Sequence, residues 1–264
     1  MTTPPSIPQL SQALTSLGLP PPHPSFLVPI LTPGPSQRLP PLPALIATAK
    51  LRLLNADFTS ALTLDPSRTP SLPTHISDPS IASRVLDADV PVQVIGIEDL
   101  SRSKWEQVEA LEMERKGELT KGREVIRVVP DSEDGASAAV LGGPVSTQHT
   151  QAMGRSNGPF KLLMEDVKGQ RVYGFELKKV EKVGYPPVMS IGCKVILKSG
   201  GKVARGMVLL EPATVVVLGG KIEALDKSWR EGREKALRDA VGDRRSGDTG
   251  SNNGGGTNAT INID

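Results

Sequence analysis

The stretch that decides the fold runs Phe160-Lys161-Leu162-Leu163-Met164-Glu165-Asp166 and is followed by further short apolar runs. These further runs lie at residues 172–177, 192–197, 205–212 and 215–220. Apolar runs of this length, separated by turn residues at intervals of about ten, are typical of a small barrel or sandwich. The sequence therefore predicts a small β-barrel over residues 160–220.

Alternate residues of a strand share a face, so each run supplies one set of side chains to a barrel interior. We expect three such sets to fill it: Phe160, Leu162 and Met164; Tyr173, Phe175 and Leu177; and Cys193, Val195 and Leu197. We also expect Leu209 to be a buried leucine of the barrel. Residues 166–169 and 199–201 contain the glycines that tight turns need.

Four motifs in this region, in this order, resemble one known family. They are Leu-Leu-Met-Glu-Asp at 162–166, Tyr-Gly-Phe-Glu at 173–176, Gly-Met-Val-Leu-Leu-Glu-Pro at 206–212 and Val-Val-Leu-Gly-Gly-Lys-Ile-Glu-Ala-Leu at 216–225. The set resembles the oligonucleotide-binding (OB) fold of the RecQ-mediated genome instability protein one family, most specifically through residues 209–225. That family is the non-catalytic subunit that works with topoisomerase III and a RecQ-type helicase.

The resemblance implies an α+β fold in which a small N-terminal helical bundle packs on a five-stranded OB-fold barrel. Seventeen of the 24 prolines lie before residue 80, so helices there must be short. We expect helices at 7–17, 24–31 and 43–62, a first barrel strand at 90–97, a helix from Ser103 to about Arg115, and a last helix at 221–239.

The predicted domains are a helical bundle at 1–64, a connector at 65–85, and an OB-fold domain at 86–240 with an insertion loop at 117–158. We expect a disordered tail at 241–264. Nothing after residue 239 is expected to form a second barrel, so the chain resembles the fungal-type, single-barrel members of the family.

Composition argues against an enzyme. The single cysteine, Cys193, excludes an intramolecular disulfide and a cysteine-cluster zinc site. His23, His75 and His149 have no nucleophile at a recognisable spacing, and the acidic residues form no metal-ligand motif. We expect no catalytic residues, no metal, no cofactor and no small-molecule ligand. The sequence has no run of about eighteen apolar residues that would predict a membrane span, so we expect a soluble, intracellular protein. The family resemblance implies that it is nuclear.

Single-strand DNA binding is one hypothesis for the barrel. Basic residues expected on its outward faces could contact phosphates: Lys161, Arg171, Lys178, Lys179, Lys194 and Lys198. The alternative is an ordinary solvated strand face. The net charge is only +2 and aromatic residues are 3% of the chain. We therefore expect weak DNA binding, because strong single-strand binders need a basic groove and exposed aromatic rings.

Protein binding is the other hypothesis, and it centres on the insertion. An apolar β-branched run with arginines stands out there: Arg123, Glu124, Val125, Ile126, Arg127, Val128 and Val129. If exposed, this run would invite a partner; alternatively it is a short strand that docks on its own barrel. The resemblance favours the first reading, because the family's insertion at this position reaches the gate of the topoisomerase. It implies a scaffold that binds topoisomerase III, helps to recruit the helicase and promotes dissolution of double Holliday junctions. The alternative function is a standalone single-strand DNA-binding protein.

Overall fold

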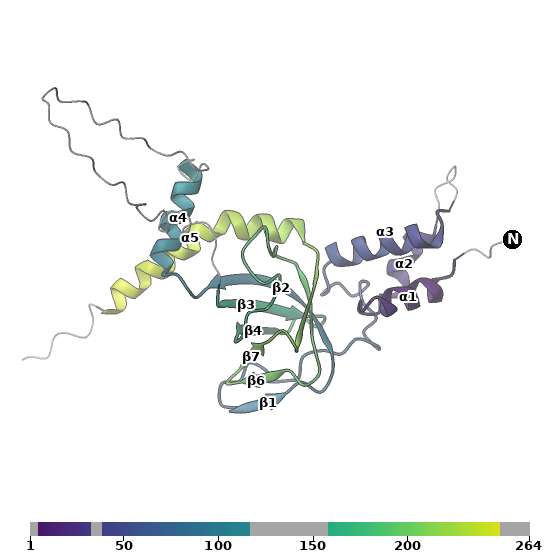
Figure 1. The fold of residues 1–264 in the computed structure, drawn as a ribbon, viewed down its shortest axis with the longest axis horizontal. Helices are drawn as coiled ribbons and strands as arrows, with labels where there is room; N and C mark the ends of the chain where they lie inside the picture. Colours follow the sequence, from purple (N-terminus) through teal and green to yellow (C-terminus); the bar gives the residue numbers. More distant parts are fainter. Residues whose placement is uncertain (1–4, 33–38, 117–157, 249–264) are drawn as a thin grey trace, which may run out of the picture. The chain divides into compact units, whose positions relative to one another are not determined.

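The computed structural model describes residues 5–32, 39–116 and 158–248 (Figure 1). The chain divides into two compact units, one of residues 1–101 with 155–231 and one of residues 102–154 with 232–264. The first unit holds the N-terminal helices and the β-sheet, and each unit is described by itself.

Three helices form the N-terminal module, which we define as residues 5–64: α1 (Ile7–Ser16), α2 (Pro24–Leu31) and α3 (Leu42–Asn55). Ser6 caps α1 through a reciprocal capping box with Gln9. The module has its own core, in which α1, α2 and α3 are joined by the segment that follows them. Its largest fully buried side chains are Leu10, Leu14, Leu27, Leu53 and Phe58.

The expected helices at 7–17 and 24–31 are confirmed, but the third helix is shorter than predicted. It ends at Asn55, and its C-cap residue Ala56 is extended, with ψ of 155°. The Asp57 carboxylate then accepts hydrogen bonds from the backbone N–H and the hydroxyl of Thr59, at 2.9 and 2.7 Å. A short acidic side chain that bonds to the backbone two residues ahead favours a turn over a continuing helix.

The described residues contain eight strands in one sheet. They are β1 (Ser83–Val85), β2 (Val90–Asp99), β3 (Phe160–Asp166), β4 (Arg171–Glu176), β5 (Lys194–Leu197), β6 (Lys202–Ala204), β7 (Met207–Leu210) and β8 (Val215–Gly219). Their order is β1-β6-β7-β4-β3-β2-β5-β8, and much of it can be followed in Figure 1. All pairs are antiparallel except β4 with β7, which is parallel. The expectation of a five-stranded barrel is not matched, because the sheet has eight strands and two of them, β1 and β6, lie outside the runs where strands were expected.

The short link between β7 and β8 makes the sheet curl. In the sheet order, β8 is at one edge and β7 is separated from it by four strands. Only residues 211–214 connect them along the chain, and the five steps from Leu210 to Val215 span at most about 18 Å. The two strands must therefore approach one another, and the sheet closes into a half-barrel around its core. That core includes Phe160, Leu162 and Met164, as well as Cys193, Val195 and Leu197, as predicted.

The predicted inner face of β4 is wrong. Tyr173 and Leu177 are 46% and 50% exposed, whereas Val172 and Glu176 are buried. Gly174 lies on the inner face because a Cβ there would be 2.7 Å from Cε of Met164. Glu176 is turned inward because its carboxylate accepts the backbone N–H groups of Phe160 and Val180, at 3.1 and 2.9 Å.

The face expected to be buried in β7, the parallel partner of β4, is also wrong. Val208 and Leu210 are buried in the core, and Leu209, expected to be buried, is only half-buried. The register pairs Phe175 with Leu209, so these two side chains share the outer face of the sheet.

The second unit contains α4 (Lys104–Lys116) and the last part of α5 (Glu223–Asp248). Helix α4 begins next to its predicted start at Ser103, where Ser103 and Glu106 form a capping box. The Ser103 N–H donates to Glu106 Oε2 at 2.8 Å, and the Glu106 N–H donates to Ser103 Oγ at 3.1 Å. Helix α5 extends beyond its predicted end at residue 239. Among the described residues, no helix is both long and apolar enough to cross a membrane.

Candidate partner-binding surface

The basic residues expected to face outward lie close to carboxylates. On the outer face of β3 and β4, Lys161 Nζ lies 2.5 Å from Glu98 Oε2, and Arg171 Nε lies 3.0 Å from Glu165 Oε1. Lys161 Nζ also lies 5.0 Å from the centroid of the Tyr173 ring. The register brings Lys161 opposite Phe175, and Glu165 opposite Arg171. These pairs neutralise the basic charge on this face.

The remaining exposed lysines of the predicted set are paired as well. Lys178 Nζ lies 3.2 Å from Glu211 Oε1, and Lys198 Nζ lies 2.5 Å from Asp89 Oδ2. The hydrogen bond from Lys198, together with one from the Ser199 N–H, holds the pKa of Asp89 below its ordinary value. Lys179 Nζ lies 3.5 Å from Glu176 Oε1 and 4.9 Å from the centroid of the Phe160 ring.

Lys194 is not on an outward surface, so that part of the prediction is wrong. The side chain is fully buried, with Nζ donating to the Gly192 carbonyl oxygen at 2.5 Å and lying 4.9 Å from the centroid of the Phe58 ring. Burial lowers the pKa of Lys194 to about 8. Phe58 belongs to the core of the N-terminal module. The lysine therefore lies between this module and the sheet.

Gln93 forms a second buried link between the N-terminal module and the sheet. Its Oε1 accepts the Phe58 N–H at 3.0 Å, and its Nε2 donates to Asp57 Oδ1 at 2.8 Å and to Glu165 Oε2 at 3.3 Å. Burial raises the pKa of Asp57, but hydrogen bonds from Gln93 and Thr59 outweigh that effect and leave it below its ordinary value. The sequence signal for this link is a lone glutamine in the apolar run that forms β2.

Burial also explains the single cysteine. Cys193 is buried in the barrel core, and burial raises the pKa of its thiol to about 11. The thiolate, which is the reactive form, is therefore scarce at neutral pH. Cys193, just before β5, acts as a small apolar core residue.

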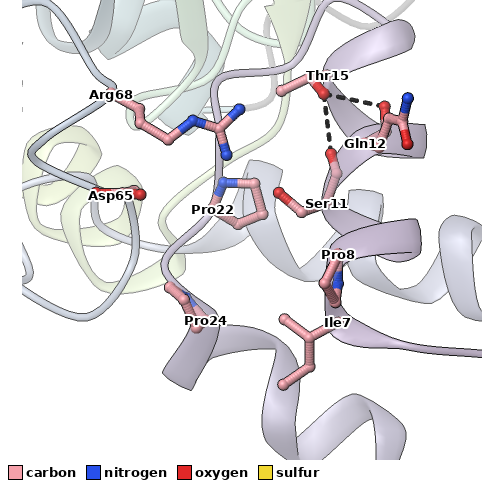
Figure 2. Close-up of a pocket in the computed structure, with 9 residues that line it drawn as sticks. All are labelled: Ile7, Pro8, Ser11, Gln12, Thr15, Pro22, Pro24, Asp65 and Arg68. Carbon is pink, nitrogen blue, oxygen red and sulfur yellow. Dashed lines mark hydrogen bonds between the residues drawn. The ribbon is translucent and has the colours of Figure 1, made fainter.

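Two hollows of the first unit have different linings. One, of about 460 Å³, lies between α1 and the segments around Pro22 and Asp65. Figure 2 shows Ser11, Gln12 and Thr15 on the α1 side and Arg68 across from them. The other, of about 550 Å³, is mostly apolar and is lined by residues 15 and 17–21 of the N-terminal module and by strands β5 and β8.

Neither hollow brings together a set of catalytic side chains. Within the described ranges, no three His, Cys, Asp or Glu side chains are grouped so that they could hold a metal ion. His23 caps α2 by accepting the Ser25 N–H on Nδ1, at 3.2 Å. His75 lies in a turn, with φ of 57°. His149 lies outside the described residues, as does the whole predicted topoisomerase-binding run: Arg123, Glu124, Val125, Ile126, Arg127, Val128 and Val129.

Strand pairing defines the class of the fold. Strands β2, β3 and β4 form an antiparallel meander, β5 pairs with β2, and β7 pairs in parallel with β4. This is the arrangement of a small, partly open barrel of the OB type. The class that the fold defines is therefore a single OB-type barrel with an N-terminal helical module.

Comparison with known proteins agrees with this class. Residues 72–233 match the family described as RMI1, N-terminal OB-fold domain. The chain belongs to this family, which confirms the resemblance found in its motifs. It is similar to RecQ-mediated genome instability protein 1 of Schizosaccharomyces pombe, with 29% identity over 139 residues. That match covers 52% of this chain and 58% of the relative, so it spans little more than half of the relative's length.

Proposed function

We propose that this protein is a non-catalytic subunit of a complex between a RecQ-type helicase and topoisomerase III. In this proposal it binds the topoisomerase, modulates the opening of the enzyme's gate, and so promotes dissolution of double Holliday junctions and genome stability in the nucleus. Membership of the RMI1 family and the name of the yeast relative support a role in the RecQ pathway.

The observation that favours a protein partner over a nucleic acid is that the predicted basic residues on the surface are paired with carboxylates. Five of the six predicted basic residues lie within 4.0 Å of a carboxylate oxygen: Lys161, Arg171, Lys178, Lys179 and Lys198. The sixth, Lys194, is buried. Affinity for a polyanion comes from cations that neutralise phosphates, and a phosphate contact made by any of these five residues would compete with an existing ion pair. A protein partner can use both members of such a pair.

The gate role is assigned to the insertion, residues 117–158. It rests on the place of this segment in the chain, after β2 and α4 and before β3. A segment that has higher affinity for the open gate than for the closed gate shifts the enzyme's equilibrium towards the open state. The run from Arg123 to Val129 is the proposed contact, because it combines apolar side chains with arginines.

One observation favours the alternative of single-strand DNA binding. Tyr173 is 46% exposed beside Lys161, and an exposed aromatic ring on an OB-type barrel can stack on a base. The sequence prediction had assigned this ring to the core, so the structure makes this alternative stronger than composition alone suggests.

Two measurements on the purified full-length protein distinguish the alternatives. We expect it to form a complex with the cognate topoisomerase III in a pull-down at physiological salt, and to bind an unstructured single strand only weakly in a salt titration. A protein that does not retain the topoisomerase, and binds the single strand at nanomolar concentration, would favour the alternative.

A further inference from the structure

The outer face of β3, β4 and β7 carries an apolar surface, and Lys161 lies at its edge with Nζ 5.0 Å from the centroid of the Tyr173 ring. The register places Leu163 opposite Tyr173, Tyr173 opposite Met207, and Phe175 opposite Leu209. Residues opposite one another in a sheet share a face. Leu177 follows Phe175 by two residues and continues the alternation of exposed and buried positions. We call this surface the Tyr173 face; it consists of Leu163, Tyr173, Phe175, Leu177, Met207 and Leu209.

Two side chains of the Tyr173 face are more exposed to solvent than the other four. Tyr173 and Leu177 are 46% and 50% exposed, whereas the other four are half-buried. This exposure follows from the inner face of β4, where Val172, Gly174 and Glu176 occupy the space inside the barrel. The strand can place only one of its faces in the core, so its larger apolar side chains are left outside.

Ion pairs lie on three sides of this apolar centre. Glu98 with Lys161 lies at the β2 and β3 side, and Glu165 with Arg171 lies where β3 ends and β4 begins. Glu211 with Lys178 lies just beyond the ends of β7 and β4. Each pair contributes one positive and one negative charge, so this rim carries no net charge. An apolar, aromatic centre inside a polar rim is the usual anatomy of a protein–protein interface.

We propose that the Tyr173 face is the main docking surface for the topoisomerase, an inference that rests on the proposed function. The complementary surface of the partner carries one or two projecting apolar side chains that pack on Tyr173 and Leu177. Charges of both signs surround those side chains and pair with the rim. A net-neutral rim gives little attraction for a polyanion, so a protein occupant is favoured over a single strand of DNA.

The test compares two surface variants in a quantitative pull-down with the purified cognate topoisomerase III. One variant combines Tyr173→Thr with Leu177→Thr, which removes the two exposed apolar side chains while keeping residues that suit a strand. The matched control is Leu51→Gln, at a position on α3 that is 63% exposed and lies outside the Tyr173 face. Thermal melting of each variant checks that the fold is intact.

We expect the double variant to bind the topoisomerase at least tenfold more weakly and the Leu51→Gln control to bind within twofold of wild type. Tyr173→Phe, which keeps the ring, should also bind within twofold. If the wild type binds and the folded double variant binds equally well, the Tyr173 face is not the dock, although the proposed function stands. If the wild type does not bind, the proposed function itself fails. Should the double variant misfold, Leu177→Thr alone, beyond the end of β4, must still weaken binding.

Discussion

The ammonium group of Lys194 lies 4.9 Å from the centroid of the Phe58 ring, so a charged side chain of the sheet is buried beneath the N-terminal module. Burial disfavours the charged form of the lysine and lowers its pKa, and the electrostatic effects of Cys193 and Asp57 compensate only in part. This contact makes the stability of the folded chain depend on pH in a way that can be measured.

The first prediction concerns that pH dependence. The pKa of Lys194 is about 8 in the folded chain, against an ordinary value of 10.5. Between these values the unfolded chain binds more protons than the folded chain, so the contribution of Lys194 to stability rises with pH. From pH 7 to pH 9 the rise is about 1 kcal/mol. Lys194→Met should abolish it. Urea unfolding at pH 7, 8 and 9 measures the difference.

Cys193 sets the upper limit of that experiment. Its pKa is raised from 9.0 to about 11 in the folded chain, so the folded chain retains a proton that the unfolded chain loses. The contribution of Cys193 to stability therefore falls between those pH values, which is opposite to that of Lys194. Up to pH 9 the effect of Cys193 is smaller than that of Lys194, and it is present in both wild type and Lys194→Met, so the difference between their pH slopes reports on Lys194. Equal pH slopes for wild type and Lys194→Met would show that Lys194 does not titrate in this range.

The second prediction tests the orientation of β7. Leu210 is fully buried in the barrel, so Leu210→Ala should lower the free energy of unfolding by roughly 2–5 kcal/mol. Leu209→Ala removes the same atoms from a half-buried position on the outer face and should cost less, about 1 kcal/mol. Urea unfolding of the two variants gives the comparison. A larger loss of stability for Leu209→Ala than for Leu210→Ala would show that Leu209, and not Leu210, faces the core.

The third prediction concerns the affinity for DNA. Because the exposed basic residues of the predicted set are paired with carboxylates, single-strand binding should have a Kd of about 1 μM or weaker at physiological salt. Fluorescence anisotropy across a salt series measures both the Kd and its salt dependence. Nanomolar affinity with a steep salt dependence would instead support a nucleic-acid-binding function.

The fourth prediction separates docking from gate control. Replacing residues 117–158 by a short Gly-Ser linker should leave the barrel folded, because the cost of closing a loop changes only slowly with its length. Binding to the topoisomerase should largely survive, and the effect on strand passage should be lost. The combination of Ile126→Asp and Arg127→Glu should give a milder form of the same separation.

Pull-down measurements alongside decatenation and double Holliday junction dissolution assays, with the cognate topoisomerase and helicase, measure both effects. Normal dissolution by the protein with the linker would rule out the gate role of the insertion. Loss of both binding and dissolution would make the insertion itself the dock, in place of the Tyr173 face.

Local patterns in the sequence predicted the β3 and β5 faces correctly, because Phe160, Leu162 and Met164 alternate with polar or half-buried residues as a simple strand does. The same rule failed for β4. The inner position is held by Gly174, which leaves room for Met164 and Leu210, and by Glu176, which binds two backbone N–H groups. Tyr173 and Phe175 are more hydrophobic than Gly174 and Glu176, so hydrophobicity alone predicts the wrong inner face. The space available inside the barrel cannot be read from the sequence of one strand.

Lys194 was misplaced for a different reason. It alternates correctly with Cys193 and Val195, and it does face away from the barrel interior, but all four residues of β5 are buried. The N-terminal module covers this strand from outside, and residues more than a hundred positions away in the chain supply the cover. No local pattern in residues 194–197 carries that information.

The Gln93 link has a consequence for how the chain can be divided. The boundary near residue 65 separates helices from strands along the sequence. However, Asp57 and Phe58, which lie before this boundary, contact Gln93 and Lys194 of the sheet and help to shield them from solvent. Removing residues 1–64 would expose a carboxamide and an ammonium group on the outer wall of the barrel, together with the apolar side chains around them. The helices and the barrel thus share buried polar contacts, and we expect a barrel without residues 1–64 to be less stable than the whole chain.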